Sequence, residues 1–340
     1  MTRDFVLPED VDAIADVALP RANQLLFGHH EAEQSFLTSF NAGRLAHAWL
    51  IGGEEGVGKA TLAFRLARHV LAQSIAPERR RDVDQAIATL SHPDLVVIRR
   101  AIDQKRNVIR PQIRVEDVRK AMQRVVTTST GDGWRVVIVD TVDDFNDHCG
   151  NALLKTIEEP PDRVLFFLLA HRPGKVQATI RSRCRRLTLA PLSDGAMQQA
   201  VTALLPSAAS DVVAASIRYG HGSPGRALRL IAKNWLELVD DMDRLFDNLG
   251  AMSARDLAAF SDRLEGRAKD DAFRLFRETL SGFIATRAAS LTRRTDGSER
   301  AARLAAVGQF ADAQFASGTT FNLPRRHMII AYLEELQRAL

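Results

Sequence analysis

The stretch AHAWLIGGEEGVGKA, residues 46–60, decides the fold class of this chain. Its first six residues are mostly apolar and predict a strand, and the glycines after them predict a loop. A helix is expected next, because Leu62, Leu66, Val70 and Leu71 recur at three- and four-residue spacing. A strand, a glycine-rich loop and a helix in this order open a nucleotide-binding α/β unit.

Residues 53–60, GEEGVGKA, nearly match the phosphate-binding loop G-x-x-x-x-G-K-[ST]. Glycines let backbone N–H groups close around phosphates, and the lysine supplies a positive charge. The candidate nucleotide-binding residues here are Gly53, Gly56, Gly58, Lys59 and Thr61. The Ser/Thr that ligates Mg²⁺ in this motif is replaced by Ala60. Thr61 is no simple substitute, because one residue along a helix turns a side chain by about 100°.

A second element of such a site is predicted at residues 135–140, RVVIVD, an apolar strand that ends in an acid. Asp140 is therefore the last candidate nucleotide-site residue. In many ATPases the following residue is an acid that prepares the attacking water. That residue is Thr141 here, and a hydroxyl cannot act as a carboxylate base. Asp143 and Asp144 lie beyond the strand and are expected to be solvated or capping residues. The chain is therefore not expected to hydrolyse ATP.

The pattern changes along the chain. Further strands are predicted at 94–99, 164–170 and 187–189, with a helix at 151–159 that Pro160-Pro161 ends. Strands that alternate with helices imply a parallel sheet covered on both faces. After Pro191 the strand-like runs disappear, and short helices followed by a longer helical bundle are expected. The predicted class is α/β plus all-α, with domains at 1–191, 192–234 and 235–340.

Composition excludes several classes of protein. The chain is 46% hydrophobic and 26% charged, which is ordinary for a globular protein. Its longest apolar run, 164–170, is too short for a membrane helix, and five acids in the first twenty residues argue against a signal peptide. Cys149 and Cys184 form no C-x-x-C pair, so we expect neither a disulfide scaffold nor a metal site. A cytoplasmic location without a membrane partner is expected.

The positive charge is concentrated in two stretches, although the net charge is only +4. Residues 172–186 hold six Lys/Arg and no acid, and residues 99–124 hold nine Lys/Arg against three acids. Such stretches can bind phosphate or an acidic protein surface, or can simply be solvated.

Four motifs carry a specific resemblance. They are NALLKTIEEPP at 151–161, IRSRC at 180–184, GRLAHAW at 43–49 and HPDL at 92–95. Together they closely resemble the AAA+ subunits of the bacterial DNA polymerase III clamp loader. The resemblance covers about residues 20–230 well and the C-terminal bundle loosely. It implies an AAA+ P-loop parallel-sheet domain, a small helical lid domain and a C-terminal helical collar domain.

Within that family, Ala60 and Thr141 make the chain look like the delta-prime subunits rather than the ATP-hydrolysing motor subunits. Motor subunits place a small polar sensor residue where His171 follows Ala170. Their phosphate-sensing arginine corresponds to Gly225, with Arg226 one residue later. Residues 73–92 contain no cysteine, so the zinc module of many relatives is not expected.

The resemblance gives Arg183 a role. The arginine of the Ser-Arg-Cys motif is inserted into the ATP site of the neighbouring subunit in this family. The resemblance also implies ATP or ADP held without hydrolysis. The implied partners are the gamma/tau motor subunits and the delta subunit, and indirectly the sliding clamp and primer-template DNA.

Two other functions remain open. The first is an active ATPase motor subunit of the clamp loader that uses Lys59 and Asp140. The second is a DNA-binding module that acts through residues 99–124 and 172–186, with an affinity that depends strongly on salt. Few aromatic residues are interleaved with these basic residues, so no base-stacking platform is evident. We also find no two-metal carboxylate site that would add nucleotides as a polymerase does.

Overall fold

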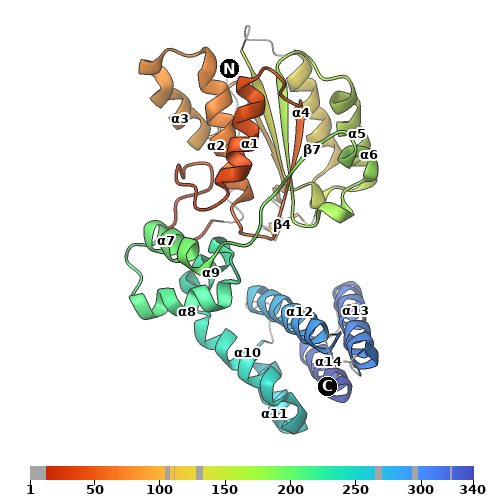
Figure 1. Ribbon diagram of the computed structural model, residues 1–340. Coiled ribbons are helices and arrows are strands. Elements are labelled where there is room, and N and C mark those ends of the chain that lie inside the picture. Colours follow the sequence, from red (N-terminus) through yellow and green to blue (C-terminus); the bar gives the residue numbers. More distant parts are fainter. Residues whose placement is uncertain are drawn as a thin grey trace. The chain divides into compact units, whose positions relative to one another are not determined.

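The structure is a computed structural model that describes residues 13–103, 108–110, 112–127, 133–264, 270–292, 298–321 and 324–340. The chain divides into two compact units, Met1–Asn234 and Trp235–Leu340. Figure 1 shows the first unit with its sheet between two layers of helices. None of the described helices is both long and apolar enough to cross a membrane.

A five-stranded parallel sheet forms the centre of the first unit, in the order β2-β5-β6-β1-β7. Its strands are β1 (Ala48–Gly52), β2 (Leu95–Arg99), β5 (Arg135–Asp140), β6 (Val164–Ala170) and β7 (Arg185–Thr188). The predicted parallel α/β sheet is confirmed. A two-stranded hairpin, β3 (Ile102–Asp103) and β4 (Val108–Ile109), was not predicted.

Alternate residues of each central strand enter different cores. Trp49 and Ile51 pack with the helices α1 (His30–Asn41), α2 (Lys59–Leu71) and α3 (Arg80–Ala88). Ala48 and Leu50 pack on the opposite face with α4 (Val115–Thr127), α5 (Asp147–Glu158) and α6 (Ala178–Arg181). This two-sided burial explains why β1, β5 and β6 are continuous apolar runs. Because all strands are parallel, the carboxyl ends of β1 and β5 lie at the same edge of the sheet, with β6 between them.

Three short helices follow the sheet, as the pattern predicts: α7 (Asp194–Leu204), α8 (Ser210–Gly220) and α9 (Pro224–Ala232). Their apolar faces share a small core that includes Met197, Val213 and Leu228. Helix α8 ends at its C-cap His221, which is left-handed with φ of 48°, and Gly222 continues the turn with φ of 75°.

The second unit is helical throughout its described residues. It contains α10 (Leu236–Asn248), α11 (Ala254–Asp262), α12 (Asp270–Thr292), α13 (Ser298–Phe321) and α14 (Arg325–Ala339). Apolar residues at helical spacing form one stripe on α12 and another on α14, and both stripes lie in its core: Phe276 and Leu280 are buried from the first, and Tyr332 and Leu336 from the second. The stripes therefore serve packing.

Candidate functional site

The phosphate-loop motif forms a tight turn between β1 and α2. Gly53, Gly56 and Gly58 have φ angles of 153°, 77° and 115°, which side chains with a Cβ rarely adopt. The first turn of α2 carries Lys59 and Thr61. The glycines are therefore required by the backbone path of the loop itself.

Lys59 lies inside this loop, with only 4% of the residue exposed. Its Nζ donates hydrogen bonds to the carbonyl oxygens of Gly53 and Glu54, each at 2.7 Å. Burial lowers the pKa of Lys59 to about 8, and the nearby carboxylates of Asp140 and Asp143 oppose that shift. The ammonium group is thus satisfied by the carbonyls of its own loop.

The helix α9 is seated directly on the loop. Gly225 donates its backbone N–H to the Gly56 carbonyl at 3.0 Å, and the Ser223 hydroxyl donates to the Glu55 carbonyl at 2.8 Å. Arg229 forms an ion pair with the Glu55 carboxylate. A Cβ at Gly225 would lie 2.8 Å from the Gly56 Cα, so the contact requires glycine on both sides.

The sensor positions have other partners in the structure. Arg226, the arginine next to Gly225, donates from Nε to the carbonyl of Tyr219 on α8 at 3.0 Å. His171 follows β6, and its backbone N–H donates to the Asp143 carboxylate at 2.6 Å.

The residues after β5 tie strand ends together. Asp143 accepts a second backbone hydrogen bond, from Arg172 at 2.9 Å, and so anchors the chain after β6. Asp144 forms an ion pair with Arg100, the residue after β2, at 3.0 Å. The expectation that these two acids are merely solvated or capping residues is therefore wrong: each holds a partner from another segment. Thr141 is 4% exposed and donates to Asp144 at 3.5 Å.

This site offers few side-chain ligands for a metal ion. Ala60 has no side-chain oxygen, and Thr141 offers a hydroxyl where a carboxylate would be needed. Among the residues that the structure describes, no group of three or more His, Cys, Asp or Glu side chains is arranged to hold a metal ion. Of the usual protein ligands of Mg²⁺, this site retains only Asp140.

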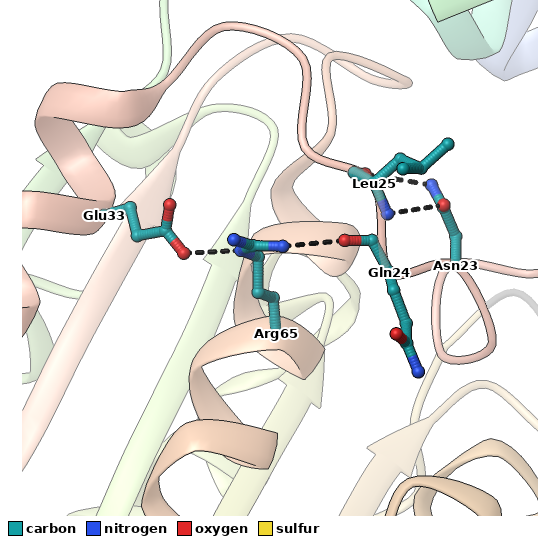
Figure 2. Close-up of polar contacts among 5 residues, drawn as sticks. All are labelled: Asn23, Gln24, Leu25, Glu33 and Arg65. Atoms are coloured by element: carbon teal, nitrogen blue, oxygen red, sulfur yellow. Dashed lines mark hydrogen bonds and ion pairs between the residues drawn. The ribbon is translucent and has the colours of Figure 1, made fainter. Parts of the chain in front are cut away.

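The segment before α1 is bound to α2, as Figure 2 shows. Arg65 donates to the Glu33 carboxylate at 2.5 Å and to the Gln24 carbonyl at 2.7 Å. The Asn23 side chain closes a local turn on Leu25, accepting its N–H at 2.9 Å and donating to its carbonyl at 3.2 Å.

His29 continues this connection to the phosphate loop, because its Nε2 lies 2.9 Å from the Val57 carbonyl oxygen. Burial lowers the pKa of His29, which favours the neutral ring at this contact. Sequence reasoning missed these residues, because their partners lie 28 to 41 positions away and no local motif marks them.

Arg183 lies on the surface just after α6, with 39% of its side chain exposed. Its Nη1 donates to the Thr179 carbonyl at 3.0 Å, and its Nη2 lies 2.7 Å from an oxygen of Glu158 at the end of α5. The next residue, Cys184, points inward, and burial raises the pKa of its thiol to about 12.

Neighbouring arginines have structural contacts. Arg181 donates to the Gly174 carbonyl at 2.7 Å, and Arg185 donates to the Ser39 hydroxyl at 2.8 Å while lying 4.9 Å from the centre of the Trp49 ring. Within the part of the chain that the structure describes, Arg183 makes no hydrogen bond or ion pair with the phosphate loop of its own chain.

Comparison with known proteins agrees with this geometry. The family model described as "DNA polymerase III, delta subunit" matches residues 28–193. The delta' subunit of DNA polymerase III from Escherichia coli K12 is 34% identical over 210 residues, which cover 59% of this chain and 60% of that protein. Over about half of its length, the chain is therefore similar to subunits of DNA polymerase III.

Clamp-loader subunits of more than one kind are similar to this chain. The gamma subunit of DNA polymerase III from Buchnera aphidicola (strain Sg) is 30% identical over 178 residues, which cover 52% of this chain and 47% of that protein. The chain thus spans about half to three fifths of the length of these relatives. A solved gamma-subunit-related protein from Thermotoga maritima aligns over 92% of this chain and 99% of that one, at 14% identity and a TM-score of 0.43.

Proposed function

We propose that this chain is a non-motor, delta-prime-type subunit of the cytoplasmic clamp loader, where it helps load the sliding clamp onto primed DNA. It would assemble with gamma/tau motor subunits and the delta subunit. In that assembly it presents Arg183 to the ATP site of an adjacent motor subunit.

One asymmetry carries the proposal. The chain lacks the magnesium hydroxyl at Ala60 and the carboxylate base at Thr141, yet it exposes Arg183 at the surface within an intact Ser-Arg-Cys motif. An arginine supplied to a neighbouring site stabilises the charge that develops on the transferred phosphoryl group, which is worth about 10³–10⁵ in rate in other systems. The chain retains the arginine that it would donate to a neighbour. It lacks the hydroxyl and the carboxylate that it would need to hydrolyse ATP itself.

We further propose that the chain's own site holds ATP or ADP, when it holds either, as a static ligand. The loop amides around Gly53, Gly56 and Gly58 would surround the phosphates, with Lys59 as the counter-charge and Thr61 and Asp140 beside them. Lys59 would exchange its contacts with the loop carbonyls for phosphate oxygens. The contact of α9 with Gly56 favours weak binding of the nucleotide, because α9 already covers this part of the loop.

The test is ATP hydrolysis by a loader reconstituted with this chain, in the presence of clamp and primed DNA. Arg183→Ala is expected to lower turnover while size-exclusion chromatography shows unchanged assembly. Arg186→Ala is the matched control, because Arg186 is exposed in the same basic stretch. Equal turnover of wild type and Arg183→Ala would refute the proposal.

An active motor subunit is the second candidate. The similarity to gamma subunits and the retained Lys59 and Asp140 favour it. The two functions differ in the purified chain, which hydrolyses ATP only if it is a motor. Turnover abolished by Lys59→Ala would establish the second candidate.

A further inference from the structure

Arg183 makes a contact that the Ser-Arg-Cys motif does not explain. Its Nη2 lies 2.7 Å from Oε1 of Glu158, and its Nη1 donates to the Thr179 carbonyl at 3.0 Å. Residues 172–186 include six basic side chains, all within the described part of the chain, and Arg183 is the one among them that pairs with a carboxylate there.

Each of the two residues that contact the guanidinium adjoins a residue of the core. Glu158 is the last residue of α5, and its neighbour Ile157 is fully buried in the core. Thr179 lies in α6, and its neighbour Ile180 is 2% exposed in the same core. The backbones of Glu158 and Thr179 are therefore held by one core, while the Glu158 side chain is itself 46% exposed.

The stability of helix α5 does not explain why a glutamate stands at position 158. A carboxylate in the last turn of a helix is unfavourable, because the helix dipole is negative at that end. Arg183 offsets this charge across the gap between α5 and α6. The pairing is therefore the stabilising feature of Glu158 at this position.

Two contacts on different nitrogens define both the position and the plane of a guanidinium group. Arginine has five N–H donors in a planar arrangement, so the Nε–H and further N–H groups remain for another acceptor. With 39% of the Arg183 side chain exposed, this remaining edge can approach phosphate oxygens of a neighbouring subunit.

We propose that Glu158 is a positioning residue that orients Arg183 for the adjacent ATP site. This inference rests on the proposed function of Arg183. Glu158 acts through Arg183 and touches no reacting atom. Exposed ion pairs bias such an equilibrium by about two- to fivefold, which sets the size of the effect.

The experiment uses the full chain in the reconstituted loader with clamp and primed DNA. Glu158→Gln is expected to lower kcat for ATP by about two- to fivefold, with KM and assembly unchanged. Glu159→Gln is the matched control, because it removes the same charge one residue later from an exposed side chain. It is expected to match wild type.

Two further readouts separate positioning from a structural role. Adding Glu158→Gln to Arg183→Ala is expected to cause no additional loss, because Glu158 acts only through Arg183. The ratio of wild-type to Glu158→Gln turnover is expected to shrink as salt rises, because an exposed ion pair is screened.

Three outcomes overturn the inference. They are a Glu158→Gln loader as fast as wild type or faster, a Glu159→Gln loader slowed to the same extent, and a double variant slower than Arg183→Ala by the factor seen in the single variant. If Arg183→Ala slows the loader and Glu158→Gln does not, only this inference fails. If Arg183→Ala has no effect, the proposed function fails with it.

Discussion

Lys59 carries an electrostatic penalty that should appear as an unusual dependence of stability on pH. The residue is 4% exposed, and burial lowers its pKa from 10.5 to about 8. Below pH 8 the amine is charged in both the folded and the unfolded chain, and the folded state bears the whole penalty. Between pH 8 and 10.5 the unfolded chain binds a proton that the folded chain has lost, so stability rises with pH in this window.

The magnitude follows from the two pKa values. A shift from 10.5 to about 8 corresponds to a penalty of about 3 kcal/mol at pH 7. At pH 9.5 the penalty falls to about 1.4 kcal/mol, so Lys59 should contribute a gain of about 2 kcal/mol between these two pH values. A methionine in its place cannot titrate and should show no such gain.

The assay is urea unfolding of the wild-type chain and of Lys59→Met at pH 7 and pH 9.5. Fluorescence of Trp49, which is fully buried in the first unit, contributes the signal. Comparing the variant with wild type at each pH cancels the other titrating groups. The free energy of unfolding of Lys59→Met minus that of wild type is expected to fall by about 2 kcal/mol from pH 7 to pH 9.5. A pH-independent difference for Lys59→Met would refute the reasoning.

Three more predictions follow from packing. Gly56→Ala should destabilise the first unit, because its Cβ would lie 2.5 Å from the Ser223 hydroxyl at a φ of 77° that favours glycine; an unchanged unfolding midpoint would contradict a role for the contact with α9. Cys184 should resist iodoacetamide at pH 8 until the chain unfolds, because its pKa is raised to about 12, and rapid native labelling seen by mass spectrometry would contradict this. Phe276→Ala should cost about 3–5 kcal/mol in the second unit, where Phe276 is fully buried, and a thermal unfolding scan that shows no loss would be inconsistent with that core.

Local pattern was sufficient for the sheet and the main helices. Strands β5 and β6 have the predicted bounds, because runs buried on both faces must be continuously apolar. The helix predicted at 151–159 begins earlier, at Asp147, because the Asn146 side chain accepts the Cys149 N–H at 3.0 Å and caps it there. The β3–β4 hairpin escaped prediction, since two-residue strands have no measurable period.

The candidate site was predicted only as far as its motifs extend. The glycine loop and Lys59 follow from local spacing, whereas the seat of α9 on the loop joins Gly56 to Gly225, far apart in sequence. The ion pair between Glu158 and Arg183 likewise joins residues that are distant in sequence. Such contacts depend on how elements pack, and a single sequence without measured distances does not specify them.

The phosphate-loop motif of this chain is weaker evidence for nucleotide binding than its sequence match suggests. A Cβ at Gly53 would lie 2.7 Å from the Leu189 carbonyl oxygen, and one at Gly56 would meet the lid, so packing alone requires both glycines. Lys59 donates to two carbonyls of the same loop and so contributes to its closure. Each of these motif residues therefore has a structural reason to be present without a bound phosphate. Ala60 and Thr141 are the positions where only nucleotide chemistry would demand a particular side chain, and both lack it. The loop therefore has the features of a structural support for α9, which agrees with the proposal that this chain contributes Arg183 to another site and has no turnover of its own.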